Sequence, residues 1–145
     1  MANLTFAVSK NGLIAPVLVG LKGETTTDLH ARGLPIPSPV ICRGLVDTGS
    51  DATAVAPWIL KRLGLGPGIP AKTQTASGTA DVEVHLVSLA VLNPNQGQQD
   101  LTIPTVVVST LATELKDADV LIGLYALLEC NFFLEGPMRR FTFAF

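Results

Sequence analysis

The chain has 145 residues, of which 48% are hydrophobic and 15% charged, and its formal net charge is −2 at pH 7. This length predicts one domain spanning residues 1–145, long enough to bury a core without disulfides or metals. The small negative charge excludes the strongly basic surface typical of nucleic-acid-binding proteins. The apolar excess suggests a surface that another chain covers.

Residues 1–23 lack a basic segment followed by a continuous apolar run, and Asn11 and Gly12 interrupt them. They therefore predict neither a signal peptide nor a membrane-spanning segment, and a cytoplasmic location fits best. The two cysteines, Cys42 and Cys130, lie far apart without CxxC spacing. We expect both to be reduced thiols that are mostly buried.

Short apolar runs separated by Gly and Pro are typical of an all-β protein. We expect strands at 4–8, 14–22, 39–46, 71–76, 80–92, 101–109, 119–123, 131–135 and 140–145. Residues 82–89 alternate cleanly, with Val82 and Val84 on one face and Val87 and Leu89 on the other. The polar segments 23–38 and 93–100 are expected to be loops rich in Gly, Pro or both.

Two segments break the strand pattern and favour short helices. Residues 57–65 begin with Pro57, which suits a first helical turn, and Gly64 provides a stop. Residues 124–130 are built from good helix formers.

Several kinds of active site are excluded by what the sequence lacks. The only two histidines, His30 and His85, have no Cys, Asp or second His at ligand spacing, so we expect no metal site. No GxSxG motif marks a nucleophilic serine. The glycine-rich run 64–70 holds two prolines and does not open a helix, so it is not a phosphate-binding loop.

The most informative stretch is 41-ICRGLVDTGSDATAV-55, in which an apolar strand ends on Asp-Thr-Gly-Ser. Such a strand is expected to lie inside the sheet, so that the turn after it is anchored in the core. Gly49 permits a close backbone approach, and the hydroxyls of Thr48 and Ser50 can bond to the backbone or to the carboxylate of Asp47. A carboxylate held in this way is a candidate catalytic acid or base, although the tripeptide alone is also compatible with an ordinary turn.

The segment around Asp47 resembles the catalytic loop of aspartic proteases, in which apolar residues precede Asp-Thr-Gly-Ser. In that family an apolar pair and a glycine, followed by a short helix, support the loop, and 120-VLIGLYALLE-129 is similar to this motif. The matching residues are Leu121, Ile122 and Gly123. Residues 73–84 look like the flap hairpin that closes over substrate.

Only one such loop is present, so the chain resembles the single-lobe, retroviral-type (retropepsin-like) aspartic proteases. The resemblance implies an all-β fold: a closed β-barrel-like lobe with one or two short helices and a flap hairpin. In this chemistry two carboxylates about 3 Å apart share one proton. A chain with one such Asp must obtain the second from a homodimer, whose axis brings two copies of Asp47 together. The implied function is an aspartic endopeptidase that cleaves a peptide or protein substrate with an activated water and no cofactor.

The resemblance also assigns roles within the loop. Asp47 is the catalytic carboxylate, Thr48 bonds across the dimer axis, and Gly49 and Ser50 shape the loop. A hydrogen bond donated by the Ser50 hydroxyl to the Asp47 carboxylate would favour the ionised form and lower the pKa of the carboxylate pair. This predicts an acidic optimum of activity. The residues expected to bind substrate are Gly49, Asp51, Ala52, Ala76, Ser77, Gly78 and Val82, with Ala54 and Val55 beside them in an apolar pocket.

The sequence departs from the retroviral pattern at Leu124, where that family commonly has an Arg paired with the aspartate that matches Asp51. The dimer is therefore expected to be held differently, and the strand 140–145 is a candidate for its interface. The alternative function is a catalytically silent module of the same fold that binds peptides or dimerises. Intact Asp-Thr-Gly-Ser favours the protease, because a pure binding protein has no use for paired carboxylates.

Overall fold

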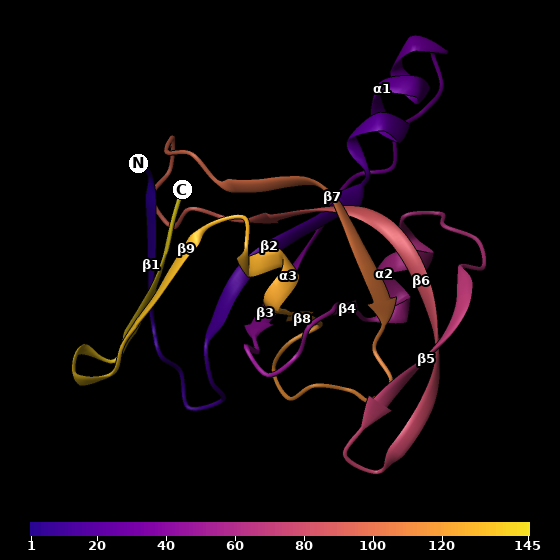
Figure 1. The fold of residues 1–145 in the computed structure, drawn as a ribbon. Coiled ribbons are helices and arrows are strands. Elements are labelled where there is room, and N and C mark those ends of the chain that lie inside the picture. Colours follow the sequence, from indigo (N-terminus) through magenta and orange to yellow (C-terminus); the bar gives the residue numbers. More distant parts are fainter.

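The computed structural model describes residues 1–145. Six of its strands close into a barrel (Figure 1). Neighbouring strands follow the order β2-β3-β8-β4-β7-β6, and β6 pairs again with β2 to complete the ring. These strands are β2 (Ile14–Leu21), β3 (Val40–Val46), β4 (Thr53–Val55), β6 (Gly78–Val91), β7 (Leu101–Thr110) and β8 (Val120–Ile122). β5 (Ile69–Thr75) pairs only with β6 and projects from the barrel as a hairpin. The predicted all-β fold with a closed barrel is confirmed.

The interior of the barrel is filled by apolar side chains that alternate along the strands. In β2, Val17 and Val19 are fully buried, and in β8, Val120 and Ile122 are buried on either side of a half-buried Leu121. These residues belong to one core cluster of 26 buried side chains. Full burial of such a side chain stabilises the fold by about 1.5–3 kcal/mol, so the alternating pattern decides which face of each strand turns inward.

The long strand β6 changes its buried face along its length. Val82 is buried near the hairpin, whereas Val87 and Leu89, from the opposite face, are buried inside the barrel and Leu86 is 41% exposed. The first part of β6 pairs with β5, and the later part joins β2 and β7 with an irregularity between Val87 and Leu89. The predicted alternation is therefore present, but strand twist turns first one face and then the other toward the core.

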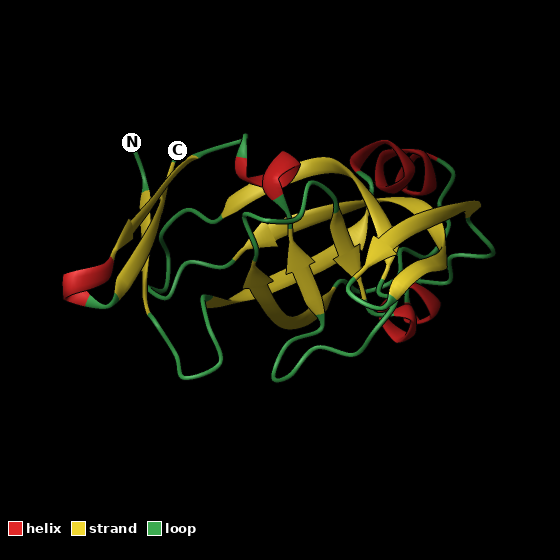
Figure 2. Cartoon of the chain, turned by 60° about the horizontal axis from the view of Figure 1, so that its bottom comes forward, coloured by secondary structure: helices red, strands yellow, loops and turns green.

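A separate three-stranded sheet joins the two ends of the chain, and Figure 2 shows it set apart from the barrel. Its order is β1-β10-β9, formed by β1 (Asn3–Ala7), β10 (Arg140–Ala144) and β9 (Asn131–Glu135). Phe141 and Phe143 of β10 are fully buried, and their rings contact those of Phe6 and Phe132 at centroid distances of 5.3–6.2 Å. Aromatic pairs of this kind add about 0.5–1.5 kcal/mol beyond their burial.

The terminal strand occupies the centre of this sheet. Both hydrogen-bonding edges of β10 are used within the chain, one by β1 and the other by β9. The edges left unpaired are those of β1 and β9, and β9 carries the exposed side chains Phe133 and Leu134. The 140–145 strand, which the sequence suggested for a dimer interface, therefore has no free edge with which to pair a second chain.

All nine predicted strands are present within two residues of their predicted ends, and the three-residue strand β4 was not foreseen. Both predicted helices form but are shorter: α2 (Pro57–Arg62) buries Ile59 and Leu60, and α3 (Leu124–Leu127) buries Ala126 and Leu127. A short 3₁₀ turn, η1 (Gly136–Met138), links β9 to β10. None of the helices is long and apolar enough to cross a membrane.

The expectation of a loop at 23–38 is wrong for its first half, which forms the helix α1 (Gly23–Ala31) that projects from the barrel (Figure 1). None of its residues is buried. The helix therefore needs no apolar face, and the sequence lacks the pattern by which a helix is recognised. Three consecutive threonines, Thr25–Thr27, also lower the helix propensity. The helix is followed by its C-cap Arg32 and then by Gly33, whose φ of 65° suits glycine after a helix end.

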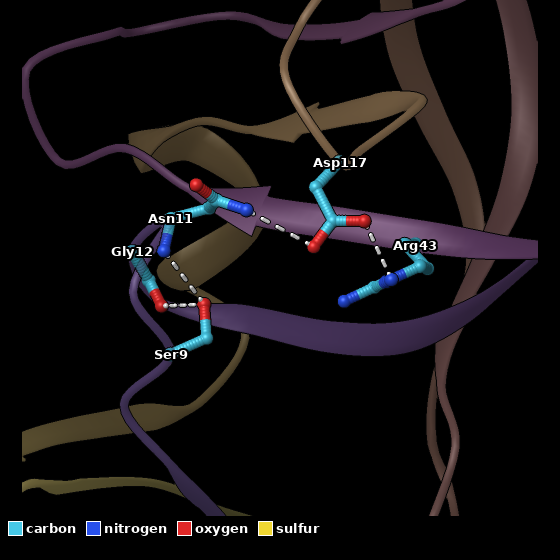
Figure 3. A network of polar contacts seen from close by, with 5 residues as sticks. All are labelled: Ser9, Asn11, Gly12, Arg43 and Asp117. Atoms are coloured by element: carbon cyan, nitrogen blue, oxygen red, sulfur yellow. Dashed lines mark hydrogen bonds and ion pairs between the residues drawn. The ribbon is translucent and has the colours of Figure 1, made fainter.

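The entry into β8 is fixed by a polar network on one side of the barrel (Figure 3). Asp117 accepts hydrogen bonds from Arg43 of β3 at 2.6 Å and from the Asn11 side chain at 3.3 Å. The turn containing Asn11 is held by Ser9, whose hydroxyl donates to the carbonyl of Gly12 at 2.9 Å. This network joins three segments that are distant in the sequence: residues 9–12, Arg43 and Asp117. The first leads into β2 and the last into β8, and both of these strands pair with β3, which ends just before Asp47.

Candidate active site

Asp47 lies where β3 leaves the barrel. Its N–H donates to the carbonyl oxygen of Ile122 at 3.0 Å, which extends the parallel pairing of β3 with β8. One residue earlier, the N–H of Val46 donates to the carbonyl oxygen of Leu13 at 2.9 Å. The backbone on which Asp47 stands is therefore bonded to a different segment on each side, and Val46 is buried beneath it.

The carboxylate of Asp47 is held by its own loop. The N–H of Gly49 donates to its Oδ1 at 2.9 Å, and the N–H of Ser50 donates to the Asp47 carbonyl oxygen at 3.2 Å. A Cβ at Gly49 would lie 3.2 Å from that same Oδ1, so glycine gives the carboxylate room. The Asp47 side chain is half-buried, while Thr48 and Gly49 are exposed. The loop thus presents one carboxylate, already hydrogen-bonded, at the surface.

The hydroxyl of Ser50 does not support the role expected for it. It donates to the carbonyl oxygen of Ala52 at 2.9 Å and closes the loop locally. The hydrogen bond to the Asp47 carboxylate comes instead from the backbone of Gly49. The acidic optimum that was inferred from a Ser50–carboxylate bond therefore loses its basis in this chain.

Gly123 packs directly beneath the loop. A Cβ on this residue would overlap the carbonyl oxygen of Ala52 and would lie 2.9 Å from that of Asp51. The N–H of Gly123 donates at 3.1 Å to Oγ1 of Thr53, which is the one buried polar side chain of the chain. Because no other residue lacks a Cβ, only glycine allows this approach. Gly123, at the end of the Leu121–Ile122–Gly123 motif, therefore lies in contact with the backbone of the loop.

The helix α3 is tied to the other end of the loop. The N–H groups of Leu124 and Tyr125 donate to the carbonyl oxygens of Ser50 and Asp51 at 2.7 and 3.1 Å. These bonds satisfy two donors of the first helical turn. The Asp51 carboxylate is exposed and forms no ion pair within the chain, in keeping with the absence of an Arg at 124.

The hairpin of β5 and β6 has the geometry of the predicted flap. Thr75 pairs with Gly78, so Ala76 and Ser77 form a two-residue turn at the tip. The Thr75 hydroxyl donates to the carbonyl oxygen of Gly78 at 2.7 Å, and Gly78 has a φ of 123°, which glycine tolerates best. Half of the side chains in the paired segments 69–75 and 78–84 are exposed, and Val82 is the one that is buried.

A cavity of about 190 Å³ separates this hairpin from the loop, and we call it the loop cavity. It is lined by Ser50, Ala52, Ala54, Thr73, Gln74, Thr75, Ser109, Thr110, Leu111, Ala112, Thr113 and Leu121. Of the residues expected to meet substrate, Ala52 and Ala54 line it. Asp47, Gly49, Asp51 and the tip residues Ala76–Gly78 do not line it.

Two residues expected in this region point elsewhere. Val55 is fully buried in the barrel core, because it alternates with Ala54 along β4 and faces inward. Val82 is 6% exposed and does not line the loop cavity. The lining residues that sequence reasoning missed, Ser109–Thr113, continue from β7, and the parallel pairing of β4 with β7 places them beside the loop. Only the alternation of Ser109 with the buried Val108 marks that position in the sequence.

Other cavities of similar size lie away from Asp47. One of about 270 Å³ is bordered by His85, Glu83 and Lys61, and another of about 300 Å³ by Trp58, Glu114 and Asp119. No group of three or more His, Cys, Asp or Glu side chains lies together as a metal site requires. The loop cavity is distinguished by its position between the Asp47 loop and the hairpin.

Comparison with known proteins supports the fold. No model of a protein family and no curated protein sequence matches the chain. The crystal structure of a retropepsin-like aspartic protease from Rickettsia conorii matches with a TM-score of 0.61 and 12% sequence identity, over 98% of this chain and 90% of that chain. At this identity the match shows a shared fold and leaves the chemistry open. The chain therefore has the retropepsin-like fold that its motifs predicted.

Proposed function

We propose that the chain is an aspartic endopeptidase whose active site is completed by a second copy of itself. The observation that carries this proposal is the geometry of the Asp47 loop. Asp47 is a hydrogen-bonded carboxylate at the end of a barrel strand, Gly123 supports the loop from below, and Ser50 and Ala52 of the loop line a cavity whose other side is a flap-like hairpin. The shared fold with a retropepsin-like aspartic protease is consistent with this chemistry.

The reaction needs two carboxylates, of which each chain supplies one. The ionised Asp47 of one copy removes a proton from a water molecule, and the water oxygen attacks the carbonyl carbon of the peptide. The protonated Asp47 of the other copy donates its proton to the carbonyl oxygen. The resulting diol collapses, the C–N bond breaks, and a proton passes to the departing amine. No acyl-enzyme forms, and the net reaction adds one water to one peptide bond.

The surface proposed to meet the second copy is apolar, and its α3 part adjoins the loop. It comprises Leu124, Tyr125 and Leu128 on and just after α3, together with the free edge of β9, whose successive residues Phe133 and Leu134 are exposed on opposite faces of the strand; these side chains are 38–70% exposed. The backbone of α3 is bonded directly to the loop, so a partner on this surface lies close to Asp47. A twofold axis here repeats the same contacts in both copies.

The test compares the wild-type chain with Asp47→Asn in the cleavage of a peptide library between pH 3 and pH 8. We expect the variant to lose activity by about 10²–10⁴-fold or more, the scale of general acid–base catalysis. Asp51→Asn is the matched control, because it removes a neighbouring exposed carboxylate and should weaken turnover without abolishing it. Equal cleavage by wild type and Asp47→Asn would refute the proposal.

A mixing experiment tests the shared site. When equal amounts of wild type and Asp47→Asn exchange freely, only about a quarter of the dimers keep two intact copies of Asp47. Activity per wild-type chain should therefore fall to about half.

Because one carboxylate must be ionised and the other protonated, the rate should also fall at both ends of the pH range. A strictly monomeric chain with full activity would contradict this mechanism, and a dimer that cleaves nothing would favour the silent module.

A further inference from the structure

The floor of the loop cavity is a row of side chains that crosses three strands. Leu121 of β8 pairs with Ala54 of β4, and Ala54 pairs with Ser109 of β7. Residues paired across a sheet share a face. Their neighbours Val108 and Val120 are buried in the barrel, so this row faces outward, toward the hairpin. Ser109 therefore places a hydroxyl on an otherwise small and apolar floor.

The walls of the cavity add more hydroxyl and amide groups and no charge. Thr73, Gln74 and Thr75 come from β5, and Thr110 and Thr113 come from the end of β7 and the turn that follows. None of the twelve lining residues is ionisable. A charged side chain entering this cavity would lose water and find no opposite charge.

Three of these hydroxyls are free to bind a ligand. The hydroxyls of Thr75 and Ser50 already donate to backbone carbonyls, and Oγ1 of Thr110 accepts the N–H of Glu83 at 3.0 Å. The side chains of Thr73, Ser109 and Thr113, by contrast, make no hydrogen bond within the chain. A purely apolar ligand would cover these groups without replacing their hydrogen bonds to water, which weakens binding.

We propose that the loop cavity selects an uncharged hydrogen-bonding side chain of the bound peptide, namely Ser, Thr, Asn or Gln. Thr73, Ser109 and Thr113 are the residues that determine this specificity. The statement that the selected peptide is also cleaved rests on the proposed protease function. The selection itself depends only on the cavity, which Asp47 does not line.

The experiment measures binding separately from cleavage. The Asp47→Asn chain keeps the cavity and cannot consume the probe. Its affinity is measured for pairs of peptide pools that are random except at one central position, which is Thr or Val in one pair and Asn or Leu in the other. Thr and Val have nearly the same shape, so their comparison isolates the hydroxyl. We expect Thr and Asn pools to bind about tenfold more tightly, which is the effect of one net hydrogen bond.

Variants locate the effect. In the same background, Thr73→Val and Ser109→Ala together should reduce the Thr:Val and Asn:Leu affinity ratios to about one. Thr113→Val, in the exposed turn, gives a second variant in case the strand changes impair folding. Thr102→Val, on an exposed position of β7 outside the cavity, is the control and should keep the tenfold ratio.

The outcomes separate this inference from the protease proposal. Preference for Val and Leu, equal affinity within both pairs, or no binding of any pool would overturn the inference, even if the wild-type chain cleaves peptides. Selective binding of Thr and Asn pools that the wild-type chain never cleaves would support the inference and refute the protease. Selective binding together with cleavage of the same pools would support both.

Discussion

The two sides of the loop cavity, the loop side and the hairpin side, are held in place in different ways. The loop side, residues 47–52, is tied to the barrel by backbone hydrogen bonds that involve Ile122, Leu124 and Tyr125. The hairpin side is the projecting part of β5 and β6, in which β5 pairs with no other strand. None of the seven side chains of β5 is buried: four are exposed and three are half-buried.

This difference is what the proposed protease function requires. A group that performs chemistry needs a fixed position, which the bonded loop side provides. A segment that covers a peptide must open to admit it, and segments with few buried contacts open at the lowest free-energy cost. We therefore expect substitutions on the loop side to act mainly on stability, and those on the hairpin side to act mainly on peptide binding.

The largest effect is expected for Gly123→Ala. Its methyl group would overlap the Ala52 carbonyl oxygen, which belongs to backbone and cannot move aside alone. We expect a loss of about 4 kcal/mol or more in the free energy of unfolding, measured by urea denaturation. Gly66→Ala is the control, because Gly66 has open space around its Cβ position and no positive φ. Similar stability of the two variants would show that the loop side is not rigidly packed.

A smaller loss is expected for Thr53→Val. The change keeps the shape of the side chain but leaves the buried N–H of Gly123 without an acceptor. An unsatisfied buried donor costs about 1–3 kcal/mol. The urea midpoint should fall accordingly, and cleavage should decrease because the loop loses support. Thr102→Val, at an exposed position, should change neither quantity, and an unaltered midpoint for Thr53→Val would contradict the role given to this bond.

On the hairpin side, Thr75→Val should affect binding more than stability. It removes the hydrogen bond to the Gly78 carbonyl that closes the turn, in a segment that is already partly exposed. We expect a loss of about 0.5–1 kcal/mol in stability, with a correspondingly small fall in the urea midpoint, and a rise in KM for peptides. Thr79→Val is the matched control, because its hydroxyl makes only a 3.5 Å contact with Gln74. A stability loss as large as that of Thr53→Val would remove the contrast between the two sides.

The sequence predicted the loop side well and the cavity poorly, for a physical reason. Alternation along strands and the DTGS and LIG motifs are local patterns, and they were enough to predict the retropepsin-like fold in which Gly123 lies beneath the Asp47 loop. The lining from Ser109 to Thr113 depends on the pairing of β4 with β7, which joins segments more than fifty residues apart and leaves no local trace. The placement of Val55 in the pocket was wrong because the short strand β4 was not recognised, so its alternation was not applied.

The helix α1 was not predicted, for a different reason. A helix is recognised in a sequence by the apolar face that it buries, and α1 buries no residue. What holds it is local: the Thr27 hydroxyl donates to the Gly23 carbonyl oxygen at 3.0 Å, and Arg32 forms an exposed pair with Asp28. Exposed pairs of this kind contribute little. The role expected for Ser50 failed for a related reason, because a hydroxyl chooses among nearby acceptors that only the folded backbone arranges.

The two cysteines offer the most sensitive measurement of the contrast, although they lie outside the cleft. Cys42 of β3 is buried, and burial together with the neighbouring Asp119 raises the pKa of its thiol to about 12. Cys130 after α3 is half-buried, and burial followed by Glu129 also raises the pKa of its thiol. At pH 8 only about one Cys42 in ten thousand is a thiolate, the reactive form, so alkylation should modify Cys130 first.

Labelling of Cys42 then reports opening of the barrel beneath the loop. In dilute urea below the unfolding transition, Thr53→Val should accelerate the alkylation of Cys42, because it loosens the strands on which the loop rests. Thr75→Val should leave that rate unchanged, since hairpin opening does not expose β3. Mass spectrometry of the alkylated chain measures both rates. Equal acceleration of Cys42 alkylation by the two variants would mean that the hairpin and the loop open together as one cooperative unit.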